Sequence, residues 1–286
     1  MIVVFGSINL DLVARVPRIP APGETLSGTA FVTAAGGKGA NQALAARQAG
    51  AYVALYGAVG RDDFARAALA NLVAAGVDLS GVARVDAPTG VALINVDVHG
   101  ENAITVVAGA NAQARADQVP QDALGPGNTL LMQLETPINA VSELAARARA
   151  AGARVVLNAA PASPLPDTLM RNVDILVVNE HEAASCAQAL GLSPDPTTFL
   201  PRMRERFGTT VVLTLGKRGA LAWIDDTVHE IAPPAVMVVD STGAGDALTG
   251  ALAAALDCGA SLADALAAGV AAGAAVCTYR GAQRAD

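Results

Sequence analysis

The sequence is poor in aromatic and charged residues. One Trp, three Tyr and five Phe are the only aromatics among 286 residues, so few rings are available to stack on a nucleobase. Charged residues make up 16% of the chain, below the roughly 25% typical of soluble proteins. The formal net charge of −7 excludes a broad attraction to nucleic acid or anionic lipid. An anionic ligand must therefore be held by local groups.

Cysteine is also scarce. Cys186, Cys258 and Cys277 are far apart and form no C-x-x-C pair, which argues against a disulfide framework or a zinc site and favours a reducing, cytoplasmic location. The three histidines lack H-x-x-x-H spacing, so a histidine metal centre has little support. The apolar run at 1–5 is too short for a signal peptide. The longest apolar stretch, 265–279, falls short of the roughly 20 residues that span a bilayer.

What the sequence does contain is a large apolar fraction, 52%, arranged in alternating strand-like and helix-like segments. This alternation predicts an α/β fold with a mainly parallel sheet. Short apolar runs predict buried strands at 2–5, 52–59, 129–134, 154–157, 174–178 and 210–215. Helical periodicity predicts helices at 39–48, 62–75, 139–151, 180–190, 197–207, 244–256 and 262–277.

Two segments, 11–33 and 89–107, lack helical periodicity and are predicted to be strands of a small separate sheet. The second contains a hairpin turn at 99–102. If the two segments pair above the carboxyl ends of the main strands, they form a β lid over the place where α/β proteins bind ligands. The remaining ranges, 1–10, 34–88 and 108–286, would form the α/β core.

The strongest motif is a glycine-rich turn that leads from a strand into an Ala-rich helix, Asp240-Ser-Thr-Gly-Ala-Gly-Asp246. The N–H groups of Gly243, Ala244 and Gly245 would form an anion hole at the positive end of the helix dipole. Asp246 beside them suits a general base for phosphoryl transfer. The alternative is an ordinary glycine-rich turn with a capping Asp. Neither a P-loop nor a complete G-x-G-x-x-G motif is present.

Polar residues near the first strand suggest a sugar clamp. Asn9 and Asp11 would share one face of the chain and could bind neighbouring hydroxyls, although a simple turn explains them equally well. The segment 35–41 places Lys38 and Asn41 among glycines that allow a ligand to approach the backbone. Its alternative interpretation is a flexible loop before a surface helix.

A further candidate site begins the helix at 180–190. Asn179 and Glu182 lie one helical turn apart, and their oxygens suit a Mg²⁺ ion contacted through water and bound to substrate phosphates. The competing interpretation is an Asn N-cap with acidic residues in the first turn.

These motifs, with Pro22-Gly-Glu24, Gln133-Leu-Glu135 and Gly281-Ala-Gln283, closely resemble in order and spacing those of the ribokinase and phosphofructokinase-B superfamily. The resemblance covers nearly the whole chain. It implies a ribokinase-like three-layer α/β/α sandwich with a mainly parallel central sheet, and a small β-sheet lid that pairs with a second lid in a homodimer. The implied reaction is ATP-dependent phosphorylation of the 5-hydroxyl of D-ribose. A nucleoside, deoxyribose or fructose kinase, or a catalytically silent sugar-binding regulator, is the alternative.

The resemblance also implies roles for individual residues. Asp246 would be the base and Gly243, Ala244 and Gly245 the anion hole, while small residues in 268–276 would line an adenine pocket. The implied sugar contacts are Asn9, Asp11, Gly37, Lys38, Asn41, Glu135 and Asp246. The implied nucleotide and Mg²⁺-water positions are Asn179, Glu182, Thr214, Gly216 and Gly245. A monovalent cation, K⁺, would be bound by Asp240 and Thr242 and by the main chain of Val276, Tyr279 and Gly281. Ribokinases usually continue past the last motif with an acidic helix that this sequence does not contain.

Overall fold

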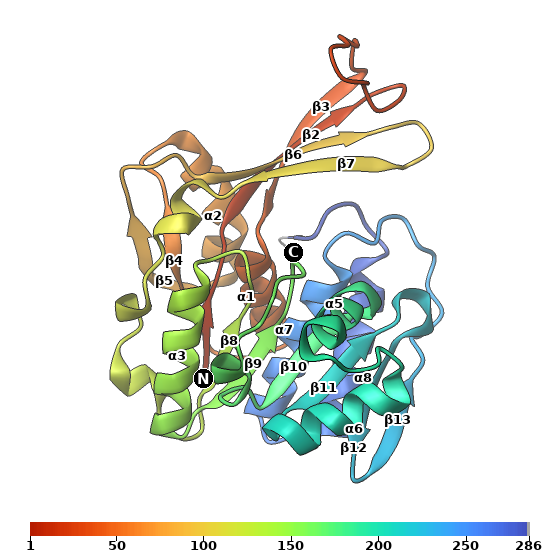
Figure 1. Ribbon diagram of the computed structural model, residues 1–286. Helices are drawn as coiled ribbons and strands as arrows, with labels where there is room; N and C mark the ends of the chain where they lie inside the picture. Colours follow the sequence, from red (N-terminus) through yellow and green to blue (C-terminus); the bar gives the residue numbers. More distant parts are fainter. Residues whose placement is uncertain (285–286) are drawn as a thin grey trace.

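A long, mostly parallel sheet runs through the centre of the molecule in the computed structural model, which describes residues 1–284 (Figure 1). Its strand order is β13-β12-β11-β10-β9-β8-β1-β4-β5. The part β11-β10-β9-β8-β1-β4-β5 is parallel, whereas β12 pairs antiparallel with both β11 and β13. The strands are β1 (Ile2–Phe5), β4 (Val53–Val59), β5 (Asp78–Arg84), β8 (Thr129–Met132), β9 (Arg154–Asn158), β10 (Ile175–Asn179), β11 (Thr210–Thr214), β12 (Ala220–Ile224) and β13 (Thr227–Ile231).

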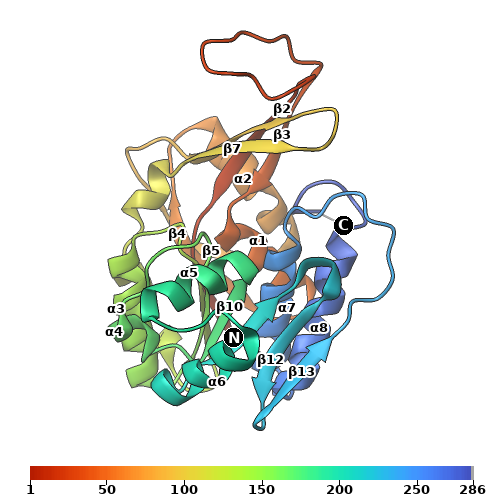
Figure 2. The same cartoon turned by 45° about the vertical axis from the view of Figure 1, so that its right-hand side comes forward.

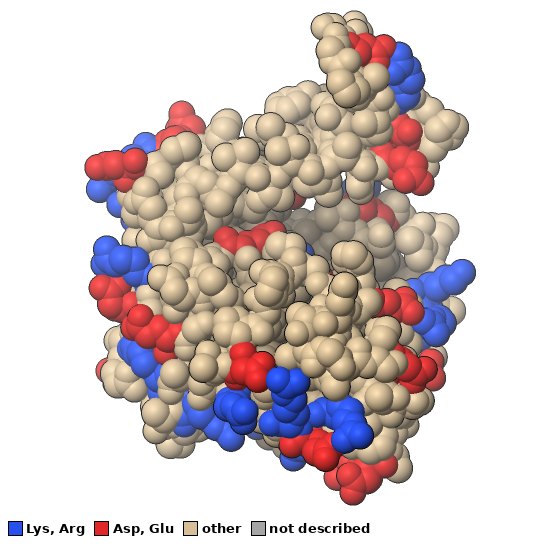
Figure 3. Space-filling view, viewed as in Figure 1, with Lys and Arg blue, Asp and Glu red and all other residues tan. Residues whose placement is uncertain are grey.

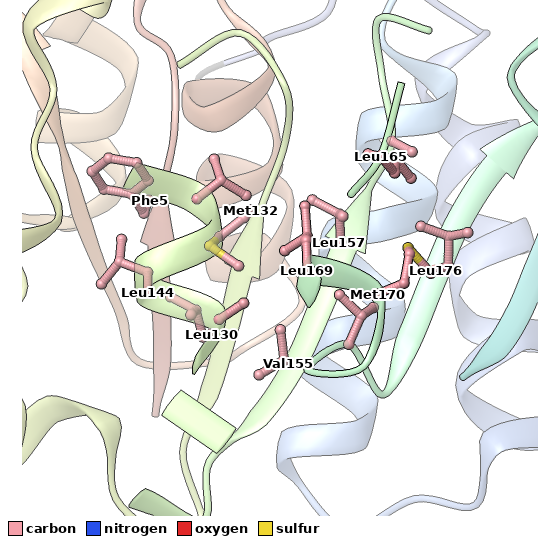
Figure 4. Close-up of a cluster of buried hydrophobic side chains, with 14 of the residues drawn as sticks. Phe5, Leu130, Met132, Leu144, Val155, Leu157, Leu165, Leu169, Met170 and Leu176 are labelled. Atoms are coloured by element: carbon pink, nitrogen blue, oxygen red, sulfur yellow. The ribbon is translucent and has the colours of Figure 1, made fainter. Parts of the chain in front are cut away.

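Helices cover both faces of this sheet. Strand alternation sends Val3 and Phe5 into one core cluster, and Ile2 and Val4 into another on the opposite face. The first cluster, part of which is drawn in Figure 4, is closed by α3 (Ile138–Ala151), α4 (Asp167–Met170), α5 (Glu180–Leu190) and α6 (Pro196–Phe207). The second is closed by α1 (Lys38–Gln48), α2 (Asp63–Ala75), α7 (Ala244–Asp257) and α8 (Leu262–Val276). The predicted three-layer α/β/α sandwich is therefore confirmed.

A second sheet projects beyond the carboxyl end of β1, as two views show (Figures 1 and 2). Its order is β3-β2-β6-β7, with β2 (Asn9–Arg15) parallel to β6 (Gly90–Val96) and antiparallel to β3 (Ala30–Gly36). The predicted hairpin of β6 and β7 (Asn102–Val107) is present, but its turn is formed by residues 97–101, since Asn102 already pairs with Val96. The strands β2 and β3 extend past the predicted range 11–33 at both ends, to Asn9 and Gly36.

All strands and helices predicted for the α/β core are present, with ends shifted by at most two residues. The elements not predicted from the sequence are β5, β12, β13, the four-residue α4 and the 3-10 turns Gly109–Gln113, Ala116–Gln118, Gln121–Leu124 and Gly216–Arg218. The strands β12 and β13 form a hairpin whose turn residues, Asp225 and Asp226, have φ of 48° and 60°. Asp-Asp is a weak signal for such a turn, in contrast to Asn-Gly. Among residues 1–284, no helix has the length and apolar character needed to cross a membrane.

Candidate active site

The surface is hollowed between the small sheet and the body of the protein, with acidic side chains in and beside the hollow (Figure 3). A cavity of about 140 Å³ lies at the carboxyl ends of β9, β10 and β11, next to the start of α7. A larger one of about 780 Å³ shares Thr214, Ser241, Ala244 and Gly245 with it. The smaller cavity is lined by Lys38, Asn158, Ala160, Val177, Val178, Asn179, Glu182, Thr214, Ser241, Gly243, Ala244, Gly245 and Asp246.

Asp246 is the third residue of α7 and is 8% exposed. Its Oδ2 accepts a hydrogen bond from Asn41 Nδ2 at 2.8 Å, and its Oδ1 accepts one from Gln42 Nε2 at 2.9 Å. Burial raises the pKa of Asp246 and outweighs the opposing effects of Lys38 and of the two amides. A carboxylate with a raised pKa, held by two donors in a cavity, has the properties of a general base.

The N-terminus of α7 offers unpaired N–H groups to the same cavity. Gly243 has φ 79°, and no side chain caps the helix within the described part of the chain. The first intrahelical bond runs from Ala247 N to Gly243 O, so the N–H groups of Gly245 and Asp246 have no helical carbonyl partner. The predicted donor Ala244 instead donates to Ser241 O at 3.2 Å. The geometry therefore leaves Gly243, Gly245 and Asp246 as the N–H groups available to an anion.

The polar groups on the lid side gather close to Asp246. Burial raises the pKa of Asp11 to about 6, and the negative charges of Glu135 and Asp246 add to the effect. Glu135 Oε2 accepts hydrogen bonds from Ser7 Oγ at 2.5 Å and from Lys38 N at 3.1 Å. Burial lowers the pKa of the Lys38 ammonium, but nearby carboxylates, Asp246 foremost, reverse the shift and raise it. The charges of Glu135 and Asp246 thus act on both Asp11 and Lys38.

Two predicted sugar contacts have partners that the sequence did not indicate. Asn9 is buried, and its Oδ1 accepts a hydrogen bond from Asn111 Nδ2 at 2.7 Å, so its own amide N–H groups remain as donors. Asn41 uses Nδ2 on Asp246, while its Oδ1 accepts from Gln283 Nε2 at 2.9 Å. Asn41 therefore contacts the carboxylate, instead of being left free for a hydroxyl. Gly37 precedes α1 and has φ 90°. A Cβ added at this position would lie 2.7 Å from Asn9 N.

Asn179 and Glu182 confirm the N-cap interpretation of this segment, and their role toward Mg²⁺ stays a prediction. They form a capping box, in which Asn179 Oδ1 accepts from Glu182 N and Glu182 Oε2 accepts from Asn179 N, each at 2.8 Å. Both also line the smaller cavity, and burial raises the pKa of Glu182. Thr214 lines both cavities, and Gly216 lines the larger one with Val270, Gly273 and Ala274 of α8.

The candidate cation residues come from two segments, the turn before α7 and the chain after α8, which Asp240 and Gly281 connect. Asp240 Oδ1 accepts the N–H and the hydroxyl of Thr242 at 2.9 and 2.7 Å, and its Oδ2 accepts Gly281 N–H at 2.9 Å. Although burial opposes them, these bonds hold the pKa of Asp240 below its usual value. The carbonyl of Val276 accepts Tyr279 N–H at 3.4 Å. Within residues 1–284, no group of three or more His, Cys, Asp or Glu side chains is placed to bind a metal ion.

Several polar residues that support the site were not predicted from the sequence: Ser7, Gln42, Asn111 and Asn158. Gln42 had a visible signal, because it lies among Ala40, Ala43 and Leu44 on the buried side of α1. An amide among apolar neighbours of a core helix must find a buried partner. The partner itself lies 204 residues away along the chain.

The family model and the individual relatives that match this chain point to the same kind of protein. A family model described as "pfkB family carbohydrate kinase" matches residues 1–286. The ribokinase of Haemophilus influenzae is 36% identical over 261 residues, which cover 88% of this chain and 84% of that protein. A bifunctional ribokinase/ribose-5-phosphate isomerase A of Fructilactobacillus sanfranciscensis is 37% identical over 265 residues. That match covers 90% of this chain but only 48% of the bifunctional protein.

Solved structures share the fold over nearly the whole chain. A ribokinase from Thermotoga maritima superposes with a TM-score of 0.90 at 31% identity, covering 99% of this chain and 94% of the other. The Arabidopsis thaliana ribokinase, whose structure is complexed with ribose and ATP, superposes with a TM-score of 0.85 at 30% identity. That superposition covers 98% of this chain and 93% of the other.

Proposed function

The chain belongs to the pfkB family of carbohydrate kinases, and from that premise we propose that it is a ribokinase, which transfers the γ-phosphoryl group of ATP to the 5-hydroxyl of D-ribose. The observation that carries the proposal is the buried Asp246 carboxylate at the uncapped N-terminus of α7. A base and an anion-binding helix end then share one cavity, as phosphoryl transfer to an alcohol requires. The relatives that are named ribokinases supply the choice of sugar.

In this mechanism Asp246 accepts the proton of the sugar hydroxyl as the hydroxyl oxygen bonds to the γ-phosphorus. The bond between the γ-phosphorus and the β,γ-bridging oxygen breaks, and ADP leaves. N–H groups at the start of α7 and the Lys38 ammonium stabilise the negative charge on the transferring group. Asn9, Asp11 and Glu135 orient the sugar, so that positioning supplies much of the rate.

The nucleotide would lie along both cavities, with its phosphates near Gly245 and its base among the small residues of α8. Mg²⁺ bound to the phosphates would be held through water by Asn179 and Glu182, since a buried carboxylate facing the cavity suits this ion, and it would neutralise phosphate charge. A monovalent cation, K⁺, would be held beside Asp240 and Thr242.

We expect turnover to cease with EDTA and to depend on K⁺ when its concentration is varied at constant ionic strength.

Two further features complete the proposal. The small sheet exposes Val32 (52%), Ile104 (53%) and Val106 (51%) on one face and Phe31 (64%) on the other, and these apolar side chains support a homodimer formed through this sheet. Sedimentation should then give a dimer mass that Ile104→Glu reduces to that of a monomer.

The three free cysteines support a cytoplasmic location, which cell fractionation would test.

A coupled assay of ADP release tests the proposed reaction. The purified chain would be given ATP with ribose, deoxyribose, fructose or adenosine, each beside a sugar-free blank. We expect ribose to give the highest kcat/KM, and mass spectrometry to locate the phosphate on O5. A higher value for another acceptor would reassign the substrate. ADP formation that no sugar accelerates, together with measurable ribose binding, would indicate a silent sugar-binding protein.

Acid pH is expected to weaken sugar binding through Asp11. Its pKa of about 6 means that the carboxyl is ionised above pH 6 and accepts sugar hydroxyls, whereas below pH 6 it is protonated and loses an acceptor. The KM for ribose should therefore rise as the pH falls through about 6, while the KM for ATP changes little. Asp11→Asn should have a high ribose KM at every pH and lose this dependence. A wild-type ribose KM that stays constant from pH 8 to pH 5 would contradict the assignment.

A further inference from the structure

We propose that Gln42 is a positioning residue for the general base: it holds the Asp246 carboxylate in the orientation that receives the substrate proton. This inference rests on the proposed function. Gln42 has no exposed surface, and its Nε2 donates to Asp246 Oδ1 and to Asn158 Oδ1, both at 2.9 Å. Its Oε1 accepts a hydrogen bond from Gln133 Nε2 at 2.7 Å. Every atom of the amide with hydrogen-bonding capacity is therefore used.

The orientation of these amides follows from a main-chain atom. Asn158 Nδ2 lies 3.1 Å from the carbonyl oxygen of Val177, which can only accept, so Asn158 Oδ1 must be its acceptor atom. Gln42 therefore presents Nε2 to Asn158 and to the carboxylate. Its Oε1 then faces Gln133, whose own Oε1 has no hydrogen-bond partner among the described residues. Reversing Gln42 would set its oxygen against two acceptors.

The packing of α1 on α7 makes this contact possible. A Cβ at Gly250 would lie 2.5 Å from the main-chain oxygen of Gln42 and 2.8 Å from Ala45 Cβ. The absence of a side chain there lets the two helices approach closely, which brings Gln42 to Asp246 one turn earlier on α7. Gln42 is therefore held by the backbone as well as by its hydrogen bonds.

The two oxygens of Asp246 each have one amide donor: Asn41 on Oδ2 and Gln42 on Oδ1. Two donors from adjacent residues of one helix fix the rotation of the carboxylate about its Cβ–Cγ bond. A base that rotates freely meets its proton less often at a reactive angle, so the effect of Gln42 should be on turnover more than on substrate binding. The charged groups that face Asp246, Lys38, Glu135, Glu182 and Asp11, are unchanged by substitution of this neutral amide.

Gln42→Met tests the proposal, because methionine has a similar length and no donor. We expect kcat to fall about 10- to 100-fold, with the KM values for ribose and ATP within about threefold of wild type. A hydrogen bond to the ionised form lowers a carboxyl pKa, so its loss raises the pKa of Asp246. The acid limb of the kcat profile should therefore move to higher pH. The matched control is Gln48→Met on the same helix. Gln48 is exposed and its Nε2 donates to Arg284 O, so this variant should have the kcat, KM values and pH profile of wild type.

Gln42→Glu provides a second test that keeps the side-chain shape. While protonated, the introduced carboxyl can donate to Asp246, but once ionised it repels the base and donates nothing. We expect activity at acidic pH and a new loss of kcat as pH rises, with thermal melting recorded at each pH to confirm folding. Folded variants with wild-type kcat and pH profile, or with raised KM values and an unshifted profile, would overturn the role of Gln42. A wild-type chain that phosphorylates no sugar would overturn the proposed function instead.

Discussion

Asp246→Asn is expected to lower kcat about 10²- to 10⁴-fold while ATP still binds. The amide has the shape of the carboxylate but cannot accept the proton of the attacking hydroxyl. Removing the buried charge favours folding, but the NH2 of the new amide faces one of the two amide donors, Asn41 or Gln42, so thermal melting of the variant is recorded beside the kinetics to confirm folding. Coupled ADP release measures kcat, and calorimetric titration measures ATP affinity.

The chain offers a matched control for this substitution. Asp264 occupies the same third position of α8, where it is exposed, and its carboxylate and N–H both bond with the Ser261 hydroxyl. Asp264→Asn changes charge by the same amount at a similar helix start, so it should keep wild-type kcat. Near-normal turnover by Asp246→Asn would remove the general base from the mechanism. Equal losses in both variants would show that helix-terminal charge, and not proton transfer, is responsible.

Gly245→Ala is expected to separate stability from nucleotide use. A Cβ at this position meets no atom within 4 Å, and Gly245 lines both cavities. Alanine is the better helix former, so the free energy of unfolding should stay the same or increase by up to about 1 kcal/mol. The added methyl group would nevertheless enter the space assigned to phosphate. We expect kcat/KM for ATP to fall about 10- to 100-fold, because small displacements of reacting groups are costly.

The measurement compares steady-state kinetics in ATP and in ribose with thermal melting of the same preparation. Gly125→Ala is the control, because Gly125 has φ −89°, which alanine can adopt. The atom closest to the added Cβ would be Asp122 O, at 3.9 Å. Gly125 lies in the loop before β8, outside both cavities. An unchanged ATP kcat/KM in a stable Gly245→Ala protein would move the phosphate site away from the start of α7.

The elements that carry the site were predictable because their signals are local. The strand at 2–5 is a short apolar run, and α7 begins at the predicted glycine-rich turn. The strand predicted to lead into that turn is wrong, because residues 232–243 form no strand. The capping box of Asn179 and Glu182 likewise depends on residues three apart. The elements that were missed, such as β5 and the hairpin of β12 and β13, have no strong period or turn signal.

The amino-acid order alone determined the alternation of strands and helices, the lid segments and the identity of Asp246 as the candidate base, since each depends on neighbours within a few residues. Only the tertiary structure decided which groups hold that base. Gln42 and Asn41 reach it across more than 200 residues of chain, and Asn111 reaches Asn9 across 102. Such pairings depend on how helices and sheets pack, and a buried amide indicates that it needs a partner without indicating which one.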